Sequence, residues 1–169
     1  MSTILSSRRP QATTLLPWHP SSSYVHGIFL HQQQYAEDIL KRTGMTNCKP
    51  ATTPVDNKPK LSSSAGHPVD DATRYRSITG ALQYLTLTRP ELAYAVQQAC
   101  LHMHAPHDVH WALIKRILRY VRGTTRHSVH LLASPSTSIV AYTDTDWAGC
   151  PDMRRLGFCV FISDSLVSW

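Results

Sequence analysis

The chain has 169 residues, of which 42% are hydrophobic and 17% are charged, and it carries a formal net charge of +6. This composition excludes a largely disordered chain, and no apolar run approaches the roughly twenty residues that a bilayer-spanning helix needs. The basic excess favours a polyanionic partner, which by charge alone is a nucleic acid or an acidic membrane surface. The four scattered cysteines form no C-x-x-C pair, and they predict free thiols in a reducing, intracellular compartment, whether cytoplasm or nucleus.

The first third of the chain alternates between irregular and regular stretches. Residues 1–24 contain three prolines and a run of serines without periodicity, which predicts an unstructured leader. Residues 24–31 are rich in β-formers and interrupted by Gly27, so we expect a hairpin edge there. Apolar side chains four residues apart predict a helix over 33–42, and the proline- and serine-rich stretch 47–71 predicts an exposed crossing loop.

Residues 72–123 have the pattern of three consecutive helices. The first, over 72–86, places apolar side chains on one face. The second is predicted to begin at Thr88-Arg89-Pro90, a hydroxyl cap followed by a proline suited to a first turn, and to run past Met103 to stop near Pro106. Asp108 is expected to cap the third helix, which runs to residue 123.

After residue 123 the sequence changes to short β-branched and aromatic runs separated by turn residues. These runs predict strands over 129–132, 139–143, 158–162 and 166–169, the last three forming an antiparallel meander. The chain stops inside the last run, which we expect of a truncated domain.

A row of basic residues marks the third predicted helix. Lys115, Arg119, Arg122 and Arg126 recur four, three and four residues apart, so at 3.6 residues per turn they form one stripe, with Arg116 at its margin. Such a stripe can neutralise phosphates and release counterions. The alternative is an ordinary solvated helix face whose cations lie near the helix C-terminus, where the dipole favours them.

Two pairs of aspartates are candidates for metal binding. Asp144 and Asp146 share a face at the end of a predicted strand, and paired carboxylates can hold a hard divalent cation, although turn-forming acids have the same pattern. Two-metal phosphodiester hydrolysis needs more such oxygens than one pair supplies. Asp70 and Asp71 follow Pro68 in a polar loop, which argues against a polymerase-type catalytic turn.

Histidines and cysteines offer weaker candidates. His102, His104, His107 and His110 crowd the junction of the second and third helices, but no cysteine or carboxylate completes a ligand set, so surface histidines without a metal are the simpler interpretation. Cys150 and Cys159 flank a predicted turn between two strands. We expect buried free thiols there, with a ligand pair or a disulfide as the alternatives.

Six stretches together resemble the copia-type retrotransposon Pol polyproteins, and they occur in family order over about residues 28–169. They are residues 34–40 (QYAEDIL), 75–85 (YRSITGALQYL), 88–96 (TRPELAYAV), 110–112 (HWA), 115–124 (KRILRYVRGT) and 142–150 (YTDTDWAGC).

The resemblance implies a domain order and a fold class. Residues 25–133 would be the C-terminal, thumb- and connection-like region of a reverse transcriptase, whose helices in the family grip the primer–template duplex. Residues 134–169 would begin an RNase H-like domain, with Asp144 at the position of its first metal-binding aspartate. The expected fold class is therefore α+β, a helical thumb/connection-like unit followed by a truncated three-stranded antiparallel RNase H-like sheet.

The departures from the family pattern shape the functional expectation. The aromatic-x-Asp-Asp turn is missing, residues 154–158 are two residues shorter than the family's Arg-Arg-Ser-Thr-Ser-Gly-Tyr stretch, and the further RNase H carboxylates are not in the chain. We expect a catalytically inactive polyprotein fragment in which Asp144 is a vestigial catalytic residue. The intact family uses Mg²⁺, but we expect no cofactor in this fragment. The expected partner is a nucleic-acid duplex, bound weakly and without sequence specificity, and not a membrane.

Two other functions remain open at this point. The chain can be a working piece of an RNA-directed DNA polymerase or RNase H, so its status as an enzyme is undecided. It can also be a partner-binding fragment that docks through exposed apolar strands onto other retrotransposon polyprotein products.

Overall fold

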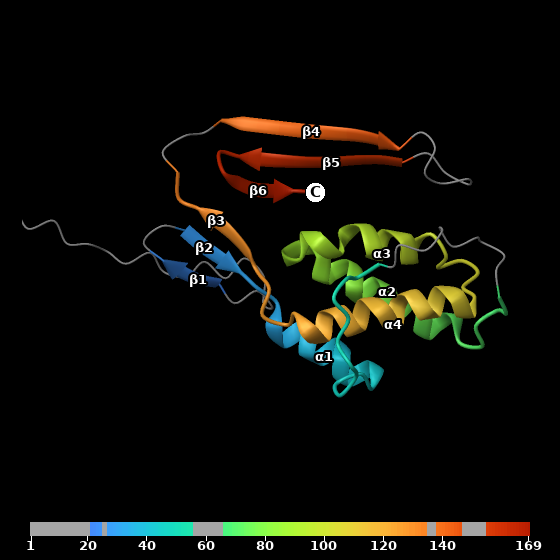
Figure 1. The fold of residues 1–169 in the computed structure, drawn as a ribbon. Helices are drawn as coiled ribbons and strands as arrows, with labels where there is room; N and C mark the ends of the chain where they lie inside the picture. The colour runs from blue at the N-terminus through green and yellow to red at the C-terminus, as the bar shows by residue number, and fades with distance from the viewer. Residues whose placement is uncertain (1–20, 25–26, 56–65, 135–137, 147–154) are drawn as a thin grey trace, which may run out of the picture.

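The computed structural model describes residues 21–24, 27–55, 66–134, 138–146 and 155–169. Helices gather in one unit, and strands form two separate three-stranded sheets (Figure 1). The elements in chain order are β1 (Ser21–Tyr24), β2 (Gly27–Leu30), α1 (Gln33–Thr43), α2 (Ala72–Leu85), the 3-10 turns η1 (Thr86–Thr88) and η2 (Pro90–Leu92), α3 (Ala93–Cys100), α4 (Asp108–Gly123), β3 (Val129–Leu132), β4 (Ile139–Asp146), β5 (Arg155–Ile162) and β6 (Ser165–Ser168).

The four α-helices enclose the core of the protein. α2 packs against α1 and α3, and α4 also packs against these two helices. The fully buried Tyr75 donates its hydroxyl to the Ala99 carbonyl oxygen at 2.8 Å, which joins α2 to α3. The buried apolar residues recur three or four positions apart along each helix. They are Ala36, Ile39, Leu40, Tyr75, Ile78, Ala81, Leu82, Leu85, Leu92, Ala95, Val96, Ala99, Ile114, Ile117, Leu118 and Val121.

The structure confirms three consecutive helices between residues 72 and 123, with one difference in the middle. Pro90 begins the 3-10 turn η2, and α3 ends at Cys100 instead of continuing past Met103. Beyond α3 the His102 and Met103 N–H groups donate to carbonyl oxygens three residues back, each at 3.2 Å. Such i→i+3 bonds tighten the chain and end the helix early.

The first sheet joins the two ends of the helical segment. β2 lies between β1 and β3, antiparallel to both, so the predicted hairpin and the predicted strand over 129–132 are confirmed. Gly27 is required by the close approach of β3, because a Cβ there would lie 2.3 Å from the Leu131 carbonyl oxygen. The pairing of β3 with β2, across about a hundred intervening residues, had no signal in the sequence.

The first strand corrects the boundary of the expected leader. Residues 1–20 lie outside the described part of the chain, but Ser21–Tyr24 form β1 and pair with β2 in register. Serine is not among the residues enriched in strands, so the local sequence did not indicate this strand, which forms by pairing with β2. The last four residues of the predicted leader therefore belong to a strand.

The second sheet is the predicted antiparallel meander, in the order β4-β5-β6. β4 and β5 are each three residues longer than predicted, and β6 begins and ends one residue earlier than predicted. The pairing of β5 with β6 has a bulge at Val160 and Phe161. β6 lies next to β3, and β4 forms the far edge (Figure 1). The mixed arrangement of helices and antiparallel sheet confirms the α+β class. Among the described helices, none has both the length and the apolar character needed to cross a bilayer.

Candidate nucleic-acid interface

The predicted basic stripe lies on α4, whose start is fixed by two histidines. His107 is the N-cap residue, and its backbone N–H donates to Nδ1 of His110 at 2.9 Å, within a capping box. The prediction of Asp108 as the cap was therefore wrong by one residue. Asp108 is the first helical residue, where its carboxylate suits the positive end of the helix dipole.

The structure separates the five predicted cations into three groups. Lys115 and Arg122 are exposed on α4, whereas Arg116 and Arg119 are half-buried. Arg126 is exposed but lies beyond Gly123, where α4 ends, so it is not on the helical stripe. The stripe on α4 therefore consists of residues 115, 116, 119 and 122.

The 46–53 segment, which follows α1, lies along this stripe. Arg116 donates through Nη2 to the Thr53 hydroxyl at 2.9 Å, and Arg119 donates through Nε to the Lys49 carbonyl oxygen at 2.7 Å. Arg122 donates through Nε to the Thr46 carbonyl oxygen. Residues 47–53 belong to the predicted exposed crossing loop, and most of them are exposed. Nothing in the sequence indicated that this part of the loop lies along α4.

Two further contacts fix the 46–53 segment against α4. The backbone N–H of Ala51 donates to the carbonyl oxygen of Arg119 at 3.2 Å. At the end of the helix, a Cβ added to Gly123 would lie 3.0 Å from the Cβ of Pro50. Gly123 therefore allows the segment to approach α4 more closely than a larger residue would.

The predicted aspartate pair occupies alternate positions on β4. Asp144 is opposite Gly157 and is exposed, and Asp146 is opposite Arg155 on β5. The side chain of Asp146 lies outside the described part of the structure. In the described ranges, no group of three or more His, Cys, Asp or Glu side chains is arranged to hold a metal ion.

The other candidate residues have structural partners. Asp71 is the N-cap of α2, and its carboxylate accepts the backbone N–H of Arg74 at 2.8 Å, so it is a helix cap. The rings of His102 and His110 stack with their centroids 3.6 Å apart. His110 is fully buried, so this part of the histidine cluster belongs to the packing around the start of α4.

The described cysteines Cys48, Cys100 and Cys159 are free and half-buried, and Cys150 lies outside the described residues. Burial raises the pKa of the Cys100 thiol, which keeps the thiol protonated and unreactive. The free state of these three described cysteines agrees with the prediction of free thiols.

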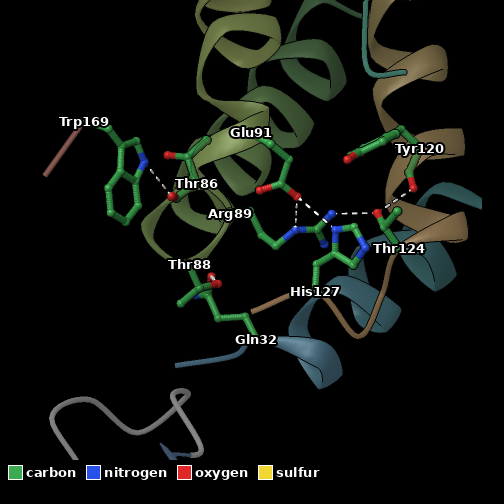
Figure 2. Close-up of polar contacts among 9 residues, drawn as sticks. All are labelled: Gln32, Thr86, Thr88, Arg89, Glu91, Tyr120, Thr124, His127 and Trp169. Atoms are coloured by element: carbon green, nitrogen blue, oxygen red, sulfur yellow. Dashed lines mark hydrogen bonds and ion pairs between the residues drawn. The ribbon is translucent and has the colours of Figure 1, made fainter. Parts of the chain in front are cut away.

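Sequence reasoning missed a polar network centred on Arg89, whose side chain is 2% exposed (Figure 2). Its Nε donates to the Glu91 carboxylate, and its Nη2 donates to the Thr124 hydroxyl at 2.6 Å. The Thr124 hydroxyl donates to the Tyr120 carbonyl oxygen at 2.7 Å, and His127 Nδ1 lies 3.6 Å from Glu91. The network connects η2 to the C-terminal end of α4.

The neighbouring Thr88 does not cap a helix as predicted. Its hydroxyl donates to Oε1 of Gln32 at 2.9 Å, just before α1 (Figure 2). On the other side of the turn, Trp169 Nε1 donates to the Thr86 carbonyl oxygen at 3.1 Å. The turn between α2 and α3 is thus a junction at which the start of α1, the end of α4 and the end of β6 meet. The nearby sequence signal for the Arg89 network was Glu91, an acidic residue two positions after Arg89.

The sequence is similar to several curated proteins. An uncharacterized mitochondrial protein of Arabidopsis thaliana is 46% identical over 154 residues, covering 89% of this chain and 61% of that protein. The retrovirus-related Pol polyprotein from transposon RE2 of the same plant is 43% identical over 145 residues, covering 85% of this chain and 10% of the polyprotein. That from transposon TNT 1-94 of Nicotiana tabacum is 34% identical over 151 residues, covering 84% of this chain and 11% of the polyprotein.

The chain therefore spans less than two thirds of each of these three relatives. No protein-family profile matches it, and no solved structure matches it.

Proposed function

The chain belongs to the family of copia-type retrotransposon Pol polyproteins, and we propose that it corresponds to the C-terminal region of the reverse transcriptase and the start of the RNase H-like domain. In this proposal residues 25–133 are the thumb- and connection-like region, and residues 134–169 begin the RNase H-like sheet. The retained activity is weak, sequence-independent binding of nucleic-acid duplexes. It is not accompanied by catalysis.

The observation that carries this proposal is the cationic surface of α4. Lys115 and Arg122 are exposed, and the hydrogen-bond partners of Arg119 and Arg122 are main-chain carbonyl oxygens, which do not neutralise a guanidinium charge. Positive charge therefore stays on this face, and phosphates that it binds would release counterions. Arg116 and Arg126 would contribute at the margins of the surface.

A salt titration of duplex binding tests the proposal. We expect wild-type affinity in the range of about 10⁻⁴ to 10⁻⁶ M at physiological salt, with a logarithmic salt slope of about −0.9 per phosphate contact. In the triple variant Lys115→Ala/Arg119→Ala/Arg122→Ala the affinity should fall and the slope should become shallower. All duplex sequences should be affected alike, because nothing in the stripe reads base edges.

A matched triple variant controls for net charge. Lys41→Ala/Arg42→Ala/Arg76→Ala removes the same number of cations, all of them exposed, from α1 and α2. We expect it to bind like the wild type. Equal losses in the two triple variants, or no loss in the α4 variant, would contradict binding by this surface.

The proposed lack of catalysis rests on the carboxylates of β4. Two-metal phosphodiester hydrolysis clamps the attacking and leaving oxygens with several carboxylate oxygens. Asp144 and Asp146 alone would form a vestigial Mg²⁺ site. We expect no polymerisation and no RNA-strand cleavage with magnesium or manganese, and metal-dependent cleavage that disappears in Asp144→Asn would instead favour an active RNase H piece.

A second candidate function is suggested by the open edge of the second sheet. On β4, Ile139 is 70% exposed and Tyr142 is 61% exposed, and the strand lacks a partner on one side among the described elements. Such an edge can add a strand from another chain. The partner would be an intact product of the same polyprotein, and its co-purification with wild type but not with Tyr142→Lys would favour this function.

A further inference from the structure

The 46–53 segment holds two arginines of α4 by the same atom. Arg119 and Arg122 each donate through Nε, to the carbonyl oxygens of Lys49 and Thr46. In the described part of the chain, neither arginine forms an ion pair or a hydrogen bond through its Nη groups. The two Nη groups of each guanidinium, which carry four of its five N–H bonds, are therefore not used within the described part of the chain.

The carbonyl partners orient these side chains without neutralising them. A free arginine samples many rotamers, and ordering it on a ligand costs free energy at the moment of binding. A side chain that is already fixed through Nε has lost part of this conformational entropy in the free protein, so binding orders it at a lower free-energy cost. The segment itself adds positive charge, because Lys49 is exposed and residues 46–53 contain no acid.

Arg119 and Arg122 lie three residues apart on α4, so their side chains leave neighbouring positions on one face of the helix. Residues three apart on an α-helix are separated by about 4.5 Å of axial rise. Phosphates on one strand of duplex DNA follow each other at about 3.4 Å of axial rise. Guanidinium side chains of this length can therefore reach neighbouring phosphates of one strand.

We propose that Arg119 and Arg122 are paired phosphate-binding forks, each of which binds one backbone phosphate through its outer Nη edge while the 46–53 segment positions it through Nε. This inference rests on the proposed duplex binding and adds to it a geometric requirement. The Lys49 and Thr46 carbonyl groups are positioning groups, and the Lys49 ammonium group is an additional cation beside the forks.

Replacing both arginines by lysine tests whether binding depends on the shape of the guanidinium groups or only on their positive charge. Arg119→Lys/Arg122→Lys keeps both charges but removes the Nε donors and the planar, bidentate edge. We expect duplex affinity to fall about threefold to tenfold, the range that one modest net hydrogen bond accounts for, with an unchanged salt slope. The control Arg74→Lys/Arg76→Lys, on the exposed part of α2, should bind like wild type.

The outcomes distinguish this inference from the proposed function. Wild-type affinity in Arg119→Lys/Arg122→Lys, combined with weakened binding in the alanine triple variant on α4, would overturn the forks and leave charge-based binding in place. An alanine triple variant that binds like wild type would overturn both. A circular dichroism melt of each variant establishes that the helical unit is folded before its affinity is compared.

Side-chain NMR of the wild-type protein supplies a measurement that needs no variant. With unlabelled duplex added to ¹⁵N-arginine-labelled protein, we expect the Nη resonances of Arg119 and Arg122 to shift. Their Nε–H protons should stay protected from exchange, because the carbonyl contacts persist. Loss of Nε–H protection on binding would show that the segment is displaced by the duplex, which would overturn its positioning role.

Discussion

The helical unit and the β4–β6 sheet differ in how far their apolar side chains are buried. In the helical unit, helices α1 to α4 bury their apolar faces against one another, and Ile117 is completely buried. In the sheet, large apolar residues remain exposed on both faces, including Ile139 on one and Tyr142 on the other. The difference indicates that the helices contain most of the folding free energy, because burial of apolar surface is its main favourable contribution.

Hydrogen bonds join the β4–β6 sheet to other parts of the chain. Ser165 Oγ accepts the backbone N–H of Leu132 on β3 at 2.8 Å, and Trp169 Nε1 donates to the Thr86 carbonyl oxygen at the end of α2. Each such bond contributes about 0.5–1.5 kcal/mol net. We therefore expect the sheet to open locally at a lower free energy than the helical core.

The largest expected effect comes from equivalent isoleucines in the two regions. Ile117→Ala should lower the free energy of unfolding by about 2–5 kcal/mol, because it leaves a cavity in a closed core. Ile139→Ala should change it by no more than about 0.5 kcal/mol, as for most exposed positions. Urea denaturation followed by circular dichroism measures both, and a similar cost for the two variants would mean that a layer covering the sheet makes it part of the same core.

The sequence predicted this contrast only in part. Apolar spacing located α2 and α4 within about one residue, because a helix that buries one face must repeat its apolar positions every three or four residues. The strand over 129–132 was found by its β-branched and aliphatic run, whereas its pairing with β2 depends on the tertiary fold. Local patterns do not encode which distant strand supplies the hydrogen bonds.

The candidate site shows the same limit. The spacing of the cations on α4 predicted a stripe, but the acceptors of Arg119 and Arg122 are backbone carbonyl groups about seventy residues away, and any residue type supplies a carbonyl. The burial of Arg89 was missed for a related reason, since its Thr124 partner lies at the far end of α4. His107 was overlooked as a cap because histidine is not among the preferred N-cap residues.

The second prediction compares a buried ion pair with an exposed one. Glu91→Gln leaves the buried Arg89 guanidinium without a charged partner, and we expect a loss of about 1–3 kcal/mol in the free energy of unfolding. Asp38→Asn removes the exposed partner of Lys41, 3.7 Å away on α1, and should cost about 0–0.5 kcal/mol. Both are measured by thermal denaturation, and the effect of Asp38→Asn alone should decline in high salt.

Equal costs at Glu91 and Asp38 would count against a structural role for the Arg89 network. They would mean that water solvates the guanidinium once the carboxylate is gone, despite its 2% exposure. A large loss at Glu91 would instead show that the Arg89 network holds the end of α4 against the turn between α2 and α3.

The smallest expected effect compares two helical glycines, and it tests how firmly the 46–53 segment lies on α4. Gly80 is exposed on α2 and an added Cβ meets nothing within 4 Å, so Gly80→Ala should raise the free energy of unfolding by about 0.5–1 kcal/mol through helix propensity alone. At Gly123 the added Cβ would lie 3.0 Å from the Cβ of Pro50, so the segment must shift by a few tenths of an ångström. We expect this shift to weaken the contacts at Arg119 and Arg122 and to cancel the propensity gain, which leaves Gly123→Ala within about 0.5 kcal/mol of wild type.

Urea denaturation compares the two variants, and hydrogen exchange at the Ala51 amide, which donates to the Arg119 carbonyl oxygen, should become faster in Gly123→Ala only. If Gly123→Ala were as stabilising as Gly80→Ala and left the Ala51 amide protected, the segment would be adjusting at no cost, and its contacts would be too weak to hold the arginines of α4 in place.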